Sequence, residues 1–206
     1  MKPTSNTMDN HLIESFVNYY DERKKLANID GWIGGSTASD ILKPVYLALR
    51  AIKLNLLQLL NKKNIRWTLQ MSIGQGAATP DHYIAILPPK QKVSNGIYFC
   101  ICFDRNGTGC VMGAMTSLFT PQHVDMPPVV RAEQFSNPST RSKDWRMLPP
   151  NTVNVWTRNN AFFNPVEFTC EYMLNQSDTI KMEITSHIDC SMQIVQDIID
   201  NKNSCR

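Results

Sequence analysis

The chain has 206 residues, a formal net charge of +3 at pH 7 and 42% hydrophobic residues. A chain of this length can bury one sizeable core, so we expect one domain. The small net charge excludes a basic coat over the whole surface, and any binding of a polyanion must depend on local basic groups.

No apolar run reaches the ~18 residues of a membrane span, and residues 1–6 lack the apolar core of a secretion signal. We therefore expect a cytoplasmic protein without membrane contact. The six cysteines include no Cys-x-x-Cys pair and no matching histidine spacing. This spacing predicts neither a metal site nor another cofactor, and it does not suit a disulfide framework.

The N-terminal part predicts an amphipathic helix that Asp9 or Asn10 caps and that ends near the basic triplet Arg23-Lys24-Lys25. Cations in the last turn favour the helix dipole, so this triplet is either a solvated helix end or a contact to phosphate.

A second helix is expected to begin at Ser39 or Asp40, with Pro44 in its first turn. Its broad apolar stripe, from Val45 to Leu60, is expected to pack on a sheet.

The stretch from Trp67 to Phe103 predicts three strands. Apolar and polar residues alternate in Trp67–Ile73, a period of two that marks a half-buried strand. A Gly-x-Gly bend follows at residues 74–76, and then a nearly all-apolar strand, Tyr83–Leu87, which Pro88 and Pro89 end. The turn at residues 94–96 leads into the strand Ile97–Phe103.

The two faces of the strand Ile97–Phe103 differ. Ile97, Phe99, Ile101 and Phe103 form a core face. Tyr98, Cys100 and Cys102 form a face of lower volume with one aromatic ring, and this face either leaves a hollow or packs a helix.

The remaining chain predicts a hairpin at Asn106-Gly107, because Asn-Gly supplies positive φ, and a long surface excursion rich in proline. The other expected elements are a returning strand over 110–115, the excursion over 118–151, strands over 153–156 and 166–172, an aromatic loop over 159–165, and a closing helix from Thr185 or Ser186 to Asp200. We expect an α+β single domain, with a curved, mainly antiparallel mixed sheet flanked by helices. Residues 1–64 form the N-terminal helices, residues 65–202 the core that packs with them, and residues 203–206 a tail.

The segments Ser72–Gly76, Tyr83–Ala85 and Ser94–Tyr98 resemble the N-terminal DNA-binding domain of McrB-type, modification-dependent restriction systems. The Ser-Asn-Gly-Ile-Tyr turn is the most specific of these motifs. The resemblance extends from Ile65 to Lys202 and is close only as far as Phe103. Gln75 replaces an aromatic residue of the best-known member, and His82 stands where a proline precedes the strand aromatic.

This resemblance implies a phage-defence module that binds duplex DNA containing 5-methyl- or 5-hydroxymethylcytosine and flips the base into an aromatic-lined pocket. It implies a targeting part of a restriction system rather than an enzyme. The chain contains no phosphate-binding Gly-Lys-Ser/Thr motif, so the GTPase domain and the separate nuclease subunit of such systems are expected partners.

Carried over by position, the resemblance places Tyr83, Tyr98 and Cys102 in the base pocket, with Phe163 as a third aromatic and Ala85 beside Tyr83. A thiol at position 102 takes less room than a leucine, which admits a bulkier base substituent. The DNA contacts expected around the pocket come from Ser72, Gln75, Asn95, Lys90, Lys92 and Arg66.

This interpretation requires a cavity that Tyr83 and Tyr98 wall and that opens to solvent. For each of these residues the alternative is ordinary packing or a solvated surface charge. For the whole chain the alternatives are a small DNA-acting nuclease or hydrolase and a protein-interaction domain. The isolated histidines 82, 123 and 187 are expected to be structural and hydrogen-bonded.

Overall fold

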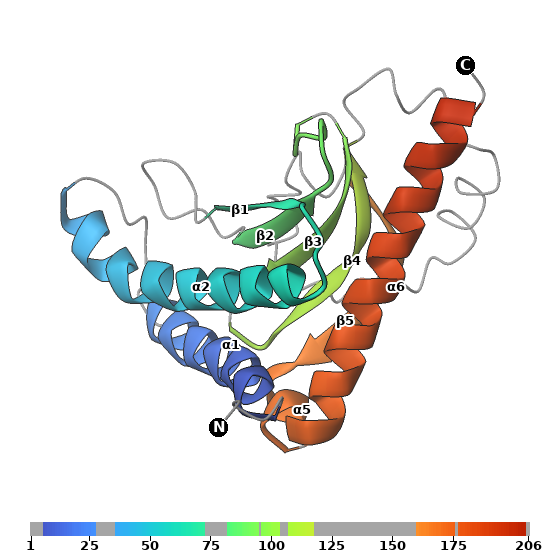
Figure 1. Cartoon of the computed structure of the whole chain (residues 1–206). Helices are drawn as coiled ribbons and strands as arrows, with labels where there is room; N and C mark the ends of the chain where they lie inside the picture. The colour runs from blue at the N-terminus through green and yellow to red at the C-terminus, as the bar shows by residue number, and fades with distance from the viewer. Residues whose placement is uncertain are drawn as a thin grey trace.

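The computed structural model describes residues 6–27, 36–72, 82–94, 96–103, 107–117, 160–175 and 177–204. These residues form the predicted α+β domain, with a five-stranded, fully antiparallel sheet whose strands follow one another in sequence order and which does not close on itself (Figure 1). The described elements, in chain order, are α1 (Asn6–Ala27), α2 (Ser36–Lys62), β1 (Thr68–Ser72), β2 (Tyr83–Leu87), β3 (Ile97–Phe103), β4 (Gly109–Ser117), β5 (Asn160–Thr169), α5 (Cys170–Asn175) and α6 (Ser177–Ser204).

The three strands predicted between Trp67 and Phe103 are confirmed. β2 and β3 have the predicted bounds, and β1 lies inside the predicted range. The turn between β3 and β4 contains Gly107 with φ of +69°, as the Asn-Gly pair predicts. A Cβ atom at this glycine would lie 2.8 Å from the Tyr20 carbonyl oxygen, so the turn packs tightly against α1. The Gly-x-Gly bend at residues 74–76 lies outside the described residues.

The prediction for the chain around residue 165 is wrong. Residues 160–165 were expected in a loop and Cys170–Tyr172 in a strand, but β5 covers the first segment and α5 contains the second. The register shifts at Gly113, because Met112 pairs with Val166 and Ala114 pairs with Phe163. Asn164 and Pro165 thus lie opposite one residue of β4. A bulge of this kind accommodates a proline inside a strand, and this explains why the proline did not end it.

The helices begin earlier than predicted. α1 begins at Asn6 rather than after Asp9, α2 at Ser36 rather than Ser39, and α6 at Ser177 rather than near Thr185; α6 also extends to Ser204, into the expected tail. Pro44 therefore lies inside α2 instead of in its first turn. A proline in a helix interior removes one hydrogen bond and bends the helix. The first turns of α2 are inclined to the rest in Figure 1.

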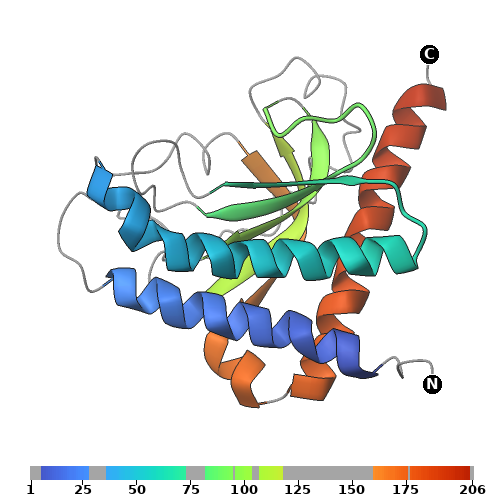
Figure 2. The same cartoon turned by 60° about the vertical axis from the view of Figure 1, so that its left-hand side comes forward.

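All three long helices cover one face of the sheet. α1 and α2 lie side by side, and α6 crosses the opposite end of the same face (Figure 2). Lys63, just after α2, forms an ion pair with Asp189 of α6 and joins the two helices. No helix of the described residues is long and apolar enough to span a membrane.

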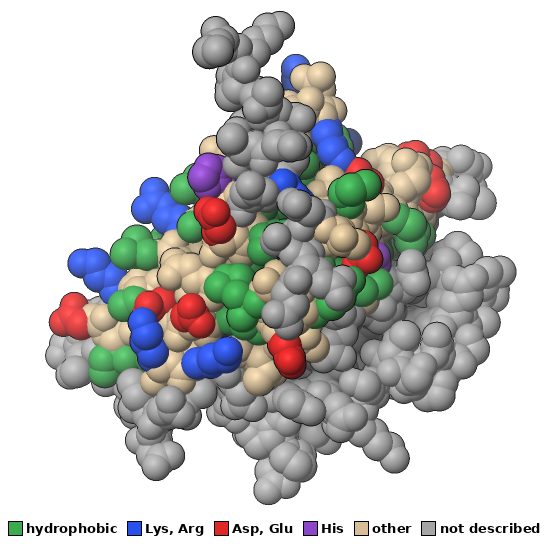
Figure 3. All heavy atoms as spheres, turned by 90° about the horizontal axis from the view of Figure 1, so that it is seen from below, with side chains coloured by type: hydrophobic (Ala, Val, Ile, Leu, Met, Phe, Trp, Pro, Cys, Tyr) green, Lys and Arg blue, Asp and Glu red, His purple; other side chains and the backbone are tan. Residues whose placement is uncertain are grey.

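The basic triplet at the end of α1 is not uniformly solvated, contrary to the first interpretation. Arg23 is only 6% exposed, whereas Lys25 is exposed and pairs with Glu22 at 2.5 Å. Lys24 Nζ lies 3.9 Å from Cys170 Sγ, so its side chain contacts the start of α5. Figure 3 shows the underside of the molecule, where α1 and α5 lie, and there basic, acidic and apolar side chains are interspersed.

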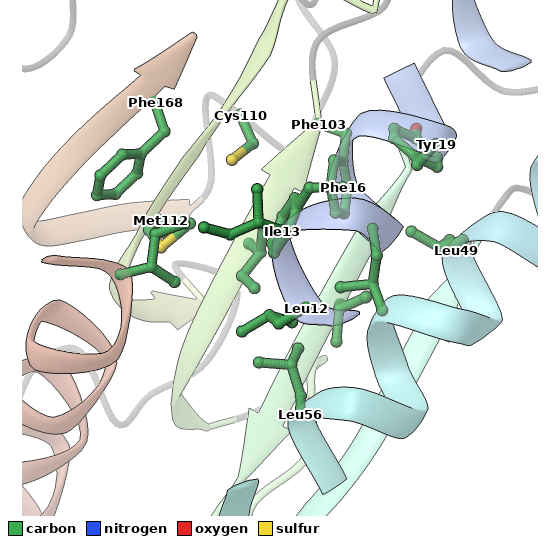
Figure 4. Packing of buried hydrophobic residues seen from close by; sticks show 14 of the residues in the cluster. Leu12, Ile13, Phe16, Tyr19, Leu49, Leu56, Phe103, Cys110, Met112 and Phe168 are labelled. Carbon is green, nitrogen blue, oxygen red and sulfur yellow. The ribbon is translucent and has the colours of Figure 1, made fainter. Parts of the chain in front are cut away.

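The main core lies between the helices and the sheet face that carries Ile84, Ile86, Phe99, Ile101 and Phe103, which we call the helix face. Figure 4 shows the side chains of α1 and α2 meeting those of the strands. The ring centroids of Tyr19 and Phe103 are 4.4 Å apart, and those of Phe16 and Phe103 are 5.8 Å apart. Each such buried side chain contributes ~1.5–3 kcal/mol, so this cluster dominates the stability of the domain.

Candidate functional site: the cysteine face of the sheet

The opposite face of the sheet carries a separate, smaller cluster. Its members are alternate residues of β2 and β3, together with Met115 of β4 and Val93 of the loop between β2 and β3, and we call it the cysteine face. Its buried residues are Ala85, Leu87, Tyr98, Cys100, Cys102 and Met115, with Tyr83 and Val93 partly buried against them. No residue of a described helix belongs to this cluster. The low-volume face predicted from β3 therefore exists, and the described helices pack on its other side.

The strand register brings three predicted site residues into one row. Ser72 of β1 is the partner of Tyr83 in β2, and Tyr83 is in turn the partner of Cys102 in β3. Directly opposite residues of an antiparallel pair share a face of the sheet. Ala85 pairs with Cys100 in the next row. Five residues that the sequence scatters over 31 positions are thus neighbours on this face.

Tyr83 lies at the rim of the cysteine face and is half-buried. Burial raises the pKa of its phenol to about 12, the neighbouring thiols of Cys100 and Cys102 add to the rise, and a hydrogen bond with Ser72 offsets part of it. The phenol is therefore neutral over the whole physiological range. A neutral, partly exposed aromatic ring with a hydroxyl group offers a flat surface and a hydrogen-bond donor.

Tyr98 does not line a solvent-open cavity, and this corrects the prediction for that residue. Its side chain has no exposed surface, and its hydroxyl donates a hydrogen bond to the Val93 carbonyl oxygen at 3.2 Å. Burial raises the pKa of Tyr98 far above its ordinary value, and the Cys100 and Cys102 thiols act in the same direction. Tyr98 packs in the same cluster as Tyr83, and its hydrogen bond to Val93 holds the loop that joins β2 to β3.

The cysteines of this face are free thiols in close contact. Cys100 and Cys102 are both buried, and their Sγ atoms are 3.6 Å apart, at the distance of a weak S–H···S hydrogen bond. They are the small buried hydrophobes that the sequence predicts. Within the described ranges, no three His, Cys, Asp or Glu side chains group as a metal site.

The loop from Pro88 to Gly96 carries the two predicted lysines, Lys90 and Lys92, and both are exposed. Gln91 holds the loop, because its Oε1 accepts a hydrogen bond from the Ile97 amide at 3.0 Å, and a Cβ atom on Gly96 would lie 2.7 Å from that oxygen. Sequence reasoning missed Gln91 as a residue that positions this loop. The glycine at the end of the turn is the only local signal for it.

The remaining predicted site residues are Arg66, Phe163, Gln75 and Asn95. Arg66 is exposed just before β1. The backbone of Phe163 is the partner of Ala114, which packs against α6 on the helix side, whereas Phe162 is the partner of Met115 of the cysteine face. The register therefore sets Phe162, and not Phe163, opposite this cluster. Gln75 and Asn95 lie outside the described residues.

Two of the three histidines have the structural contacts predicted for them. His82 is fully buried, and its Nδ1 lies 2.8 Å from the Tyr19 hydroxyl. His187 Nε2 lies 2.9 Å from the Met112 carbonyl oxygen, and burial lowers the pKa of this imidazole. His123 lies outside the described part of the chain.

Comparison with protein-family models, with curated proteins and with solved structures gives no match for this chain.

Proposed function

We propose that the protein binds duplex DNA that contains a modified cytosine and takes the flipped base at the rim of the cysteine face. The observation that carries this proposal is the row Ser72–Tyr83–Cys102, in which a half-exposed tyrosine lies opposite a small thiol. No helix of the described residues packs on this face of the sheet. The proposal also draws on the motif resemblance of Ser72–Gly76 and Ser94–Tyr98.

Tyr83 suits the recognition of a flipped base. Base–aromatic stacking is worth ~1–3 kcal/mol, which offsets much of the few kcal/mol that flipping costs. Because its pKa is near 12, the phenol carries no negative charge that would repel DNA phosphates. Its hydroxyl and that of Ser72 are hydrogen-bonding groups for the polar edge of a base.

The small residues next to Tyr83 suit a substituted pyrimidine. Ala85, Cys100 and Cys102 have less volume than the isoleucines at the neighbouring positions of the helix face. A methyl or hydroxymethyl group at C5 takes space that a leucine at position 102 would occupy. In this proposal Tyr98 supports the loop above the site rather than stacking on the base.

Exposed basic groups supply the sequence-independent part of the affinity. Lys90, Lys92 and Arg66 are solvent-exposed and lie next to β2, β3 and β1 in the chain. Each phosphate contact adds about one counterion to the salt dependence of binding. In this proposal the chain targets the modified site, and a GTPase domain and a separate nuclease subunit carry out cleavage.

The decisive experiment compares short duplexes that differ at one base, which is cytosine, 5-methylcytosine or 5-hydroxymethylcytosine. We expect tighter binding of at least one modified duplex, and 2-aminopurine fluorescence beside that base should rise as the base leaves the stack. Tyr83→Leu should weaken binding of the modified duplex by about 5- to 150-fold, the loss of one stacking interaction. Equal affinity for all three duplexes contradicts the proposal.

Tyr46→Leu is the matched control, because Tyr46 is a 39% exposed tyrosine on α2, away from the cysteine face. It should leave DNA binding unchanged. Incubation of the modified duplex with the protein and Mg²⁺ tests the alternative of a nuclease, which cleavage by this chain alone would favour. A complete absence of DNA retardation at low salt would favour a protein-interaction domain instead.

A further inference from the structure

Helix α2 has an outer face that the domain does not cover. Its inner face, with Val45, Leu49, Ile52, Leu56 and Leu60, is buried in the main core. On the outer face large apolar side chains remain open to solvent: Tyr46 is 39%, Leu47 49%, Leu54 48% and Leu57 37% exposed. Four of the six large exposed hydrophobic residues found among the described residues belong to this one helix.

The three leucines lie on one stripe. Residues 47, 54 and 57 are spaced by seven and three positions, which places them on one side of a helix. The stripe from Leu47 to Leu57 is ~15 Å long at 1.5 Å per residue. Single exposed apolar residues need no explanation, but an aligned set marks a surface for a partner.

The same face is basic. Lys43 and Arg50 lie among the leucines at helical spacing, and Lys53 lies at the edge of the stripe. None of the three forms an ion pair within the described part of the chain. Asp40 is the only acidic residue of α2. By contrast, charges of both signs are interspersed on the underside of the molecule (Figure 3).

The charges on the outer face of α2 indicate which kind of partner this face binds. A second copy docked through its own α2 would bring like charges together. The exposed face of α6 carries Asp197 and Asp200. Among the side chains of α6 that the structure describes, Met182 is the one large exposed apolar residue, and it does not match three leucines. A membrane surface is a poor match, because Lys43 and Arg50 lie within the apolar stripe and not along its edges.

We propose that the outer face of α2 binds an amphipathic helix of a partner protein, with its apolar side on Leu47, Leu54 and Leu57. Carboxylates of that helix face Lys43, Arg50 and Lys53. This is the helix-on-helix mode of recognition, in which a few apolar anchors set affinity and the charges set orientation and partner choice. The proposal does not depend on DNA binding, because α2 and the cysteine face lie on opposite sides of the sheet.

The test uses a synthetic helical peptide of about three heptads, with leucine at the seam positions and glutamate beside them. The comparator carries lysine in place of glutamate. Binding to the full chain is measured by fluorescence anisotropy, and amide chemical shifts locate the contact. We expect the glutamate peptide to bind, with shifts confined to α2, and the lysine peptide to bind at least about tenfold more weakly.

Leu54→Ser should weaken the glutamate peptide about tenfold or more, and Arg50→Glu should reduce its preference over the lysine peptide. Both side chains are exposed, so the fold should persist, which circular dichroism checks. Leu174→Ser, at a 56% exposed leucine of α5, is the matched control and should change nothing. Equal binding of both peptides, or shifts outside α2, would overturn the proposal.

Two further outcomes would assign the face to another occupant and overturn the proposal. One is sedimentation of the protein with phosphatidylserine-containing vesicles, reduced by Leu54→Ser, without binding of the peptide. The other is a dimer of the chain that Leu54→Ser dissociates.

Discussion

Strand β3 contributes side chains to both faces of the sheet, and the two sets of side chains differ in size and chemistry. Phe99, Ile101 and Phe103 point from β3 into a core covered by three helices, whereas Tyr98, Cys100 and Cys102 point to the other side. The helix face is large, apolar and close-packed. The cysteine face is small in volume and keeps hydroxyl and thiol groups beside one another. The comparison indicates that the helix face provides most of the stability, whereas the cysteine face gathers polar and thiol side chains in a small cluster.

The largest expected effect comes from Phe103→Ala on the helix face. It should lower the free energy of unfolding by ~3–5 kcal/mol, because the ring contacts Phe16 and Tyr19 and leaves a cavity when removed. Urea denaturation followed by circular dichroism measures this loss. A loss below ~1 kcal/mol would contradict the assignment of the main core to this face.

A pair of enlarging substitutions compares the room on each face. Ile101→Phe should cost about 1–3 kcal/mol of unfolding free energy, because the helix face is close-packed. Cys102→Leu should cost less, since its partner Tyr83 is half-exposed and the added atoms reach the rim. The same variant should lose preference for a modified cytosine. Equal costs for the two variants would mean that the cysteine face has no spare room.

Removing the Tyr98 hydroxyl group tests whether its hydrogen bond orders the loop beside the cysteine face. Tyr98→Phe loses the bond to the Val93 carbonyl oxygen and should cost about 0.5–1.5 kcal/mol. Faster amide hydrogen exchange should be confined to the loop from Pro88 to Gly96. If exchange rises equally in β3 and β4, Tyr98 supports the sheet and not that loop.

The smallest expected effect is a change in pH dependence at His187. Burial lowers the pKa of its imidazole from the ordinary value near 6.5, and its hydrogen bond to Met112 opposes part of this change. Between the two pKa values the unfolded chain binds more protons, so stability falls as the pH drops below about 6.5. His187→Gln keeps a donor for the carbonyl oxygen and should flatten this fall in urea midpoints. An unchanged slope would contradict this assignment.

Much of the fold could be predicted from local sequence pattern. The apolar run before Pro88 located β2 to the residue, and the apolar run after the turn at residues 94–96 located β3. The Asn-Gly pair located the positive φ of Gly107. These features depend on residues close in the chain. The paired faces of β3 also followed from a period of two, which is why Cys100 and Cys102 were correctly expected on one buried face.

The errors occur where distant contacts decide the structure. The proline at position 165 suggested a loop, but pairing with β4 through a bulge at Gly113 keeps it in a strand. No local pattern shows this pairing, because it depends on a strand that folds against the segment.

In the candidate site, too, some features were predicted from the sequence and others depend on contacts that the sequence does not show. Sequence placed Tyr83, Ala85 and Cys102 together correctly as neighbours. It did not show that Tyr98 is closed to solvent, because that depends on the Val93 carbonyl oxygen and on how the loop lies. Nor did it identify Gln91 as the side chain that anchors this loop.

The sequential order of the strands affects how the domain folds during synthesis. Because β1 to β5 pair only with their neighbours in sequence, each strand can add to the previous one as synthesis proceeds. The first helix is different: α1 packs against α5 and α6, and Lys24 contacts Cys170. Helix α1 therefore reaches its final packing only after the much later α5 and α6 have been synthesised.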